Sequence, residues 1–116
     1  MPWRSRCRKT IAAPVLAAAL CATLPAALAE DPARAFRLAE EKGCFECHAI
    51  GWKLAGPAFT DVAARYRLDP QARDMLVDKL RFGGKQHWGE RFNMWPQTNL
   101  SDEETYVLVD WVLLQH

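Results

Sequence analysis

Cys44-Phe45-Glu46-Cys47-His48 stands near the middle of the 116-residue sequence. Two thiols three positions apart can each add to a vinyl group of one haem, which gives two thioether bonds. The histidine that follows directly is then held beneath the porphyrin, where its imidazole can ligate the iron. The pentapeptide therefore predicts one covalently attached haem c, bound through Cys44 and Cys47, with His48 as an iron ligand.

Three other kinds of site use a similar cysteine pair. A thioredoxin-like redox pair lies beside a βαβ pattern, and this sequence has no strand signals. A zinc site needs four ligands, and beyond the pentapeptide the chain after residue 29 offers only His87 and His116. A disulfide between Cys44 and Cys47 would leave His48 unexplained. We therefore favour haem attachment.

The first 29 residues have the pattern of a secretory signal peptide. A basic start is followed by an uncharged run, and Ala27-Leu28-Ala29 resembles a cleavage site. Pro14 and Pro25 enclose only ten residues, whereas a membrane-spanning helix needs about 20. We therefore expect cleavage after Ala29 and export, most simply to the bacterial periplasm. The mature domain is then residues 30–116, without a membrane span.

The composition fits one small domain that binds no nucleic acid. Half of the residues are hydrophobic and a quarter are charged, as in globular proteins generally. Without the first 29 residues, 11 Lys and Arg stand against 14 Asp and Glu, so the formal net charge is −3. No basic patch for nucleic acid is expected on such a domain. Cys7 and Cys21 are lost with the signal peptide, and we expect a monomer without structural disulfides.

Capping residues and apolar spacing predict about four helices and no strands. The first begins at Asp31-Pro32 and ends at Gly43, with Phe36 and Ala39 on its apolar face. The third begins at Asp69-Pro70 and ends at Gly83-Gly84. The remaining core positions are expected to be Phe59, Val62, Ala63 and Tyr66 in the second helix, Ala72, Leu76 and Leu80 in the third, and Val107 or Leu108, Trp111 and Leu114 in the last. The last helix opens with a capping box at Ser101-Asp102-Glu103-Glu104, and residues 51–57 and 85–99 are expected to be loops.

The second axial ligand must come from elsewhere in the chain. The mature methionines are Met75 and Met94. Met75 lies in an amphipathic helix, where a methionine is usually core filler. Met94 lies in an irregular loop that can cross to the other haem face. We favour Met94, with His87, water and Met75 as alternatives.

Beyond the pentapeptide, nearly the whole mature chain resembles the small bacterial class I cytochromes c. The resemblance is to the group that carries electrons in the periplasm to terminal reductases and oxidases such as nitrite reductase. It rests on Leu54-Ala55-Gly56-Pro57-Ala58-Phe59, Asp61-Val62-Ala63-Ala64-Arg65-Tyr66, Trp88-Gly89, Met94, Ser101-Asp102-Glu103 and Trp111-Val112-Leu113. It implies an all-α fold of four to five helices around one haem, with the first and last helices in contact through Phe36 and Trp111.

The resemblance also implies roles for particular residues. The Pro57 carbonyl would accept a hydrogen bond from the His48 ring, which fixes the imidazole. Trp88 would donate its indole N–H to a haem propionate, and Lys79 or Arg81 would pair with that carboxylate. The family usually has proline directly after the ligand methionine, whereas here Trp95 intervenes, so a different loop path is expected.

These features together predict a periplasmic one-electron carrier. Two protein ligands on the iron leave no position for a substrate, so the chain is not expected to be an enzyme. A haem-based sensor, which needs an open sixth position, and a haem subunit of a larger oxidoreductase complex are the alternatives.

The partners of such a carrier would be redox proteins, a donor and an acceptor such as a respiratory complex and a terminal reductase or oxidase. An apolar docking patch with basic rim charges would suit these short-lived contacts. The predicted patch is Phe45, Ile50, Trp52 and Trp95, with Lys53 and Arg91 on its rim. The alternative for the two tryptophans is burial against the porphyrin.

Overall fold

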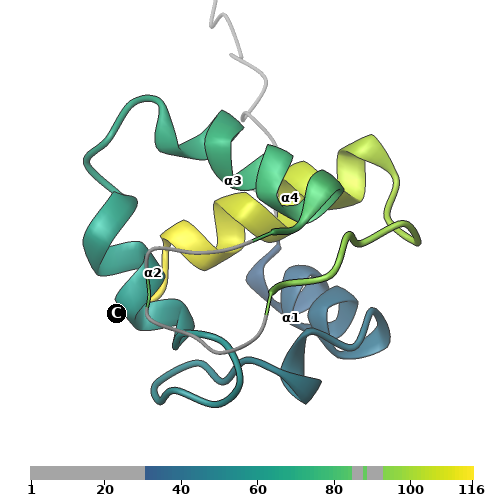
Figure 1. Cartoon of the computed structure of the whole chain (residues 1–116), viewed down its shortest axis with the longest axis horizontal. Coiled ribbons are helices and arrows are strands. Elements are labelled where there is room, and N and C mark those ends of the chain that lie inside the picture. Colours follow the sequence, from purple (N-terminus) through teal and green to yellow (C-terminus); the bar gives the residue numbers. More distant parts are fainter. Residues whose placement is uncertain (1–30, 85–87, 89–92) are drawn as a thin grey trace, which may run out of the picture.

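A computed structural model describes residues 31–84, 88 and 93–116 of the chain (Figure 1). Its elements are, in order, α1 (Pro32–Glu41), a 3₁₀ turn η1 (Cys44–Glu46), α2 (Phe59–Tyr66), α3 (Ala72–Phe82) and α4 (Asp102–Leu113). Within these residues the only extended pairing is one isolated bridge between Gly84 and Met94. The predicted all-α fold is therefore confirmed. No helix in the described residues is long and apolar enough to span a membrane.

α1 begins and ends where its capping residues predicted. The Asp31 carboxylate accepts a hydrogen bond from the Ala33 amide at 3.0 Å, and Pro32 occupies the first helical position. Gly43 follows the helix with a φ of 76°, a left-handed conformation that glycine adopts without steric cost. Cys44 begins the 3₁₀ turn directly after this glycine. The end of α1 thus sets where the cysteine pair begins.

The start of α3 differs from the prediction. Asp69 does not cap the helix, because its carboxylate accepts a hydrogen bond from the Gln71 amide at 2.9 Å and closes a separate turn. The helix begins only at Ala72, and its Gln71 cap makes no side-chain hydrogen bond. The predicted end at Gly83 is confirmed, with a φ of 63°.

α4 opens with the predicted capping box. The Ser101 hydroxyl accepts from the Glu104 amide at 3.1 Å, and the Glu104 carboxylate accepts from the Ser101 amide at 2.8 Å. Val107 and Leu108 are both buried, so the helix presents a wider apolar face than predicted. Leu114 was expected in the core and is 65% exposed, because it lies just beyond the last helical residue.

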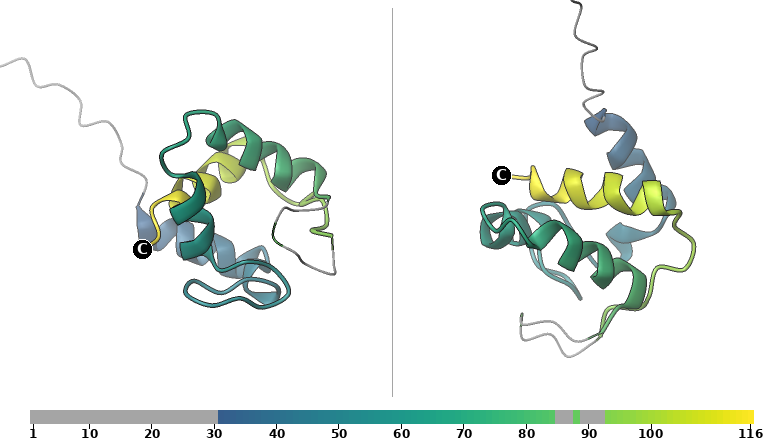
Figure 2. Two further views of the ribbon diagram at one scale, coloured as in Figure 1. Left: turned by 60° about the vertical axis from the view of Figure 1, so that its left-hand side comes forward. Right: turned by 90° about the horizontal axis from the view of Figure 1, so that it is seen from above.

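α4 is the helix against which α1, α2 and α3 all pack (Figures 1 and 2). An aromatic cluster joins α1, η1, α2 and α4, with ring centroids 5.3 to 6.4 Å apart. Its members are Phe36, Phe45, Phe59 and Trp111. The predicted contact of Phe36 with Trp111 is confirmed at 6.2 Å, in an edge-to-face geometry that aromatic pairs prefer. Phe45 was predicted on a docking surface and lies in this cluster instead.

Candidate functional site

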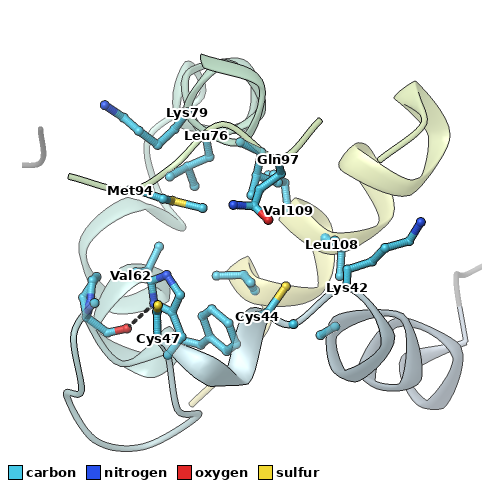
Figure 3. Close-up of a pocket in the computed structure, with 18 of the residues that line it drawn as sticks. Lys42, Cys44, Cys47, Val62, Leu76, Lys79, Met94, Gln97, Leu108 and Val109 are labelled. Carbon is cyan, nitrogen blue, oxygen red and sulfur yellow. Dashed lines mark hydrogen bonds between the residues drawn. The ribbon is translucent and has the colours of Figure 1, made fainter. Parts of the chain in front are cut away.

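One cavity of about 490 Å³ lies between the helices and the two long loops (Figure 3). Its volume is within the roughly 300–1,000 Å³ typical of small-molecule and cofactor sites. All four helices contribute to its mainly apolar wall. The six residues favoured as cofactor-binding line it, namely Cys44, Cys47, His48, Pro57, Trp88 and Met94.

The two cysteines lie on the turn that follows α1. Hydrogen bonds from Cys47 N and His48 N to the Cys44 carbonyl, at 3.3 and 3.0 Å, close this turn. Cys44 is half-buried and Cys47 is exposed, and they do not form a disulfide. Burial raises the pKa of the Cys44 thiol, so this group is neutral at neutral pH. The pair is thus held at one wall of the cavity.

His48 is fixed by its neighbours on several sides. Its Nδ1 atom lies 2.8 Å from the Pro57 carbonyl oxygen, the contact that the family resemblance implied. Because a carbonyl only accepts, Nδ1 carries the proton and Nε2 keeps a lone pair for a metal. The Phe59 ring stacks on the imidazole with centroids 5.0 Å apart and planes 19° from parallel. The local structure therefore presets the tautomer that a metal-ligating imidazole requires.

Gly56 also contacts His48, and the sequence did not reveal this contact. A Cβ on Gly56 would lie 2.8 Å from His48 Nδ1 and 2.9 Å from Nε2, closer than real side chains approach. The Gly56 amide donates to the Cys47 carbonyl at 2.7 Å, which holds the loop in place. The Gly56-Pro57 dipeptide indicated a turn, but not the histidine beneath it.

Met94 extends into the cavity from the wall opposite Cys47 (Figure 3). Its backbone pairs with Gly84 at the end of α3, through N–O distances of 2.9 and 3.3 Å. Met75, predicted to fill the core, is 38% exposed because it lies on the outer face of α3, and it does not line the cavity. His87, another candidate ligand, lies outside the described residues.

Trp88 and Lys79 both line the cavity. The Trp88 ring contacts Tyr66 with centroids 6.2 Å apart, and the Arg65 guanidinium lies 4.8 Å from its centre. Lys79 lines the cavity, whereas Arg81 does not and pairs with Asp102 at 2.8 Å. Of the two basic residues considered for the propionate, only Lys79 is therefore placed at the cavity.

The residues predicted to form a docking patch separate into two groups. Trp52 and Trp95 are 66% and 80% exposed in the polypeptide alone, and Trp95 also lines the cavity, so burial against the porphyrin stays an alternative for both side chains. Ile50 packs against the core together with Phe45. Lys53 donates to the Trp88 carbonyl at 3.4 Å, and Arg91 lies outside the described residues. The exposed apolar surface is thus smaller than predicted.

The donor set fits a haem better than the rival sites. The described residues contain no group of three or more His, Cys, Asp or Glu side chains that could hold a metal alone. They also contain no strand, and a thioredoxin-like pair requires a sheet. Two unbonded thiols, an oriented imidazole and a thioether across an apolar cavity match a covalently attached haem.

Comparisons with known proteins point the same way. A family model described as "Cytochrome c" matches residues 32–115. Cytochrome c-551 of Allochromatium vinosum is 41% identical, over 66% of this chain and 80% of its own. Cytochrome c-551 of Pseudomonas aeruginosa is 39% identical, over 77% of this chain and 81% of its own. The crystal structure of Nitrosomonas europaea cytochrome c552 superimposes with a TM-score of 0.66 and 34% identity, covering 70% of this chain and 99% of that one.

Proposed function

The chain belongs to the cytochrome c family, and on this premise we propose that it is a one-electron carrier of the bacterial periplasm with His48 and Met94 as the iron ligands. As a small class I cytochrome c it carries a covalently bound haem c and functions in electron transfer. The haem supplies an iron that takes up one electron from a donor protein and gives it to an acceptor. In the proposal, Cys44 and Cys47 provide the two thioether bonds.

The observation that carries this proposal is the position of Met94. Its side chain enters the same apolar cavity as Cys47 and His48, from the opposite wall (Figure 3). A ligand pair must reach the iron from the two faces of one porphyrin. A methionine opposite a histidine raises the reduction potential relative to other axial sets, which suits a carrier that delivers electrons to a terminal acceptor.

The remaining proposed roles belong to residues around the histidine and the cavity rim. The Pro57 carbonyl keeps the proton on His48 Nδ1, so Nε2 is the ligating atom. Trp88 has an indole N–H to donate to a propionate, and Lys79 supplies a positive charge at the same cavity. The apolar wall excludes water, which stabilises the less charged state of the iron site and so helps to set the potential.

With His48 and Met94 both on the iron, no position remains for a substrate, so we propose that the chain is a carrier and not an enzyme. A sensor would need Met94 to stay off the iron, and a fixed subunit would keep one partner permanently. The redox partners are a donor and an acceptor protein. Trp95 is exposed and lines the cavity, so it is our candidate for contact with both.

We also propose that residues 1–29 are a signal peptide and that residues 30–116 form the mature protein. The supporting features are the basic start, the uncharged run and Ala27-Leu28-Ala29; the relatives are bacterial. The intact mass of protein from a periplasmic extract should correspond to a chain beginning at Glu30 plus one haem. A mass that includes the first 29 residues would contradict the proposal.

The ligand assignment is tested by Met94→Ala. The wild-type ferric protein should show the near-infrared charge-transfer band of an iron–methionine bond, and Met94→Ala should lose it. The variant should also bind imidazole and carbon monoxide more readily and have a lower reduction potential. Met75→Leu is the matched control, because Met75 does not line the cavity, and it should cost less than about 1.5 kcal/mol of stability.

Three results would count against the ligand assignment or the carrier function. A band that persists in Met94→Ala would show that another residue ligates the iron. Rapid carbon monoxide binding by the wild-type ferrous protein would favour the sensor. Co-elution with one partner protein through gel filtration would favour the fixed subunit, and would leave the ligands unchanged.

A further inference from the structure

The segment that carries Met94 is tied to the C-terminal end of α3. Gly84 N donates to the Met94 carbonyl at 2.9 Å, and Met94 N donates to the Gly84 carbonyl at 3.3 Å. A few residues further on, Gln97 N donates to the Leu80 carbonyl at 2.7 Å. The backbone from Met94 to Gln97 therefore runs directly against the last turn of α3.

Gly83 lies at the point of closest approach. A Cβ on Gly83 would lie 2.9 Å from Pro96 N and 3.0 Å from Pro96 Cδ, and it would overlap the Met94 carbonyl oxygen. These are backbone and ring atoms, which cannot turn aside as a flexible side chain can. Gly83 has a φ of 63° and a ψ of −146°, a region that is essentially restricted to glycine.

A glycine that ends a helix does not have to lie this close to another segment of backbone. Gly43 ends α1 with a similar left-handed φ of 76°, yet a Cβ there would meet first only the flexible carboxylate of Glu46, at 3.4 Å. Gly84 has a φ of 104°, and its Cβ would meet only the Lys79 amine, at 3.9 Å. Gly84 pairs with the Met94 backbone through hydrogen bonds, but among the helix-ending glycines of the described residues only Gly83 lies where a Cβ would collide with the backbone of the methionine segment.

We infer that Gly83 is a positioning residue for Met94: its missing side chain lets the Met94–Pro96 backbone lie on α3, and this fixes where the sulfur stands in the cavity. The inference rests on the proposed ligation of the iron by Met94. A side chain at position 83 pushes the segment away from α3 and draws the sulfur out of place. The open sixth position then becomes more populated, although no ligand has been removed.

The test is Gly83→Ala in the holoprotein. Its near-infrared methionine band should weaken, its reduction potential should fall, and its ferric form should bind imidazole at least about tenfold more tightly than the wild type. A tenfold change in affinity is what the backbone strain of one residue would produce if it shifted the equilibrium between the methionine-bound and the methionine-free iron. Helical circular dichroism should be retained.

Gly51→Ala is the matched control, because a Cβ at Gly51 meets nothing within 4 Å; it should behave as the wild type. Gly84→Ala has the same kind of backbone strain without the collision, so it should change imidazole affinity less than Gly83→Ala. If Gly83→Ala does not fold, the imidazole affinity of Gly84→Ala is used instead to test the inference. A folded Gly84→Ala protein with near wild-type imidazole affinity supports the contact, and a large rise in affinity overturns it.

A folded Gly83→Ala protein with a wild-type band, potential and imidazole affinity would overturn the inference. An effect of Gly84→Ala equal to that of Gly83→Ala would also overturn it, because turn strain alone would then be sufficient. Failure of the proposed ligation gives a different result: the wild type itself would lack the band, or Met94→Ala would keep it.

Discussion

Gly56 lies against the ring of His48, and its lack of a side chain leaves room for that ring. The next residue, Pro57, supplies the carbonyl that accepts a hydrogen bond from His48 Nδ1, at 2.8 Å. The space left by Gly56 and the hydrogen bond to Pro57 depend on each other. The Pro57 carbonyl can reach Nδ1 only if the preceding backbone lies close to the imidazole. The close approach at Gly56 is therefore a requirement of the hydrogen bond at Pro57.

Gly56→Ala should displace either the loop or the imidazole. Overpacking of this kind typically costs about 1–3 kcal/mol, so the midpoint of urea unfolding should fall accordingly. The ferric absorption spectrum should change as well, because the histidine loses its fixed orientation. Gly51→Ala, in the same loop but facing open space, is the control. Equal unfolding midpoints for the two variants would refute the role given to Gly56.

The sequence identified the residues whose chemistry is visible in their own side chains. Cys44, Cys47 and His48 were named by their spacing, and Met94 by its place in an irregular segment. Gly56 and Gly83 could not be identified in this way, because their roles depend on an absent atom and on a neighbour elsewhere in the chain. Met75 and Leu114 were misplaced because apolar spacing does not show where the surface begins.

At the scale of the helices, the start of α4 is linked to the end of α1. Lys42 donates to the Asn99 carbonyl at 2.6 Å and lies 3.3 Å from the Glu104 carboxylate. Glu104 also completes the capping box of α4. One carboxylate thus stabilises the first turn of the last helix and holds the residue that precedes the Gly43-Cys44 turn.

This contact between Lys42 and Glu104 predicts that the stability of the folded protein depends on pH. The hydrogen bond from the Ser101 amide, together with Lys42, holds the pKa of the Glu104 carboxyl below its ordinary value. A lowered folded-state pKa gives stability that is present above the unfolded pKa, about 4.3, and is lost as the pH falls through the folded value. Glu104→Gln keeps a capping side chain but has no charge to lose.

The wild type should therefore lose more stability between pH 5 and strongly acidic pH than Glu104→Gln does, as measured by thermal unfolding. Glu103→Gln is the control, because Glu103 lies next to it on α4 but its side chain is 71% exposed. Parallel pH profiles for the wild type and Glu104→Gln would show that this carboxylate does not stabilise the helix junction.

Local capping signals predicted the helices better than they predicted the segments between them. Both ends of α1 and the start of α4 were correct, because each depends on residues within one turn of the boundary. α3 begins later than predicted because Asp69 caps its own turn instead of the helix. The pairing of the Met94 segment with α3 had no local signal, since it joins Gly84 to a residue well separated from it in the sequence.

At the scale of the whole molecule, the cavity interrupts what would otherwise be the core. The cavity of about 490 Å³ is mainly apolar and partly open to solvent, so without a ligand its apolar wall is left in contact with water instead of being packed. A domain of this kind has only about 5–15 kcal/mol of net stability. The haem is therefore needed to fill the protein as well as to carry the electron.

Replacing both Cys44 and Cys47 with serine should abolish covalent attachment and, with it, stable folding. Acid–acetone should extract no haem from the wild type, and the double variant should hold none covalently. The double variant should also lose helical circular dichroism and a cooperative thermal transition. The wild type prepared in parallel is the control. A colourless double variant that still melts cooperatively would show that the helices close without the cofactor.

The walls of this cavity come from residues as far apart as Ala39 and Val112, so most of the described chain surrounds a single cofactor site. A newly made chain that has not received its haem has its cavity unfilled and is expected to be open to proteases, which remove unfolded chains continuously. We therefore expect cells to keep no reserve of the haem-free protein. When iron is scarce, the polypeptide itself should disappear along with its colour, and its abundance should follow haem delivery more closely than the rate of its synthesis.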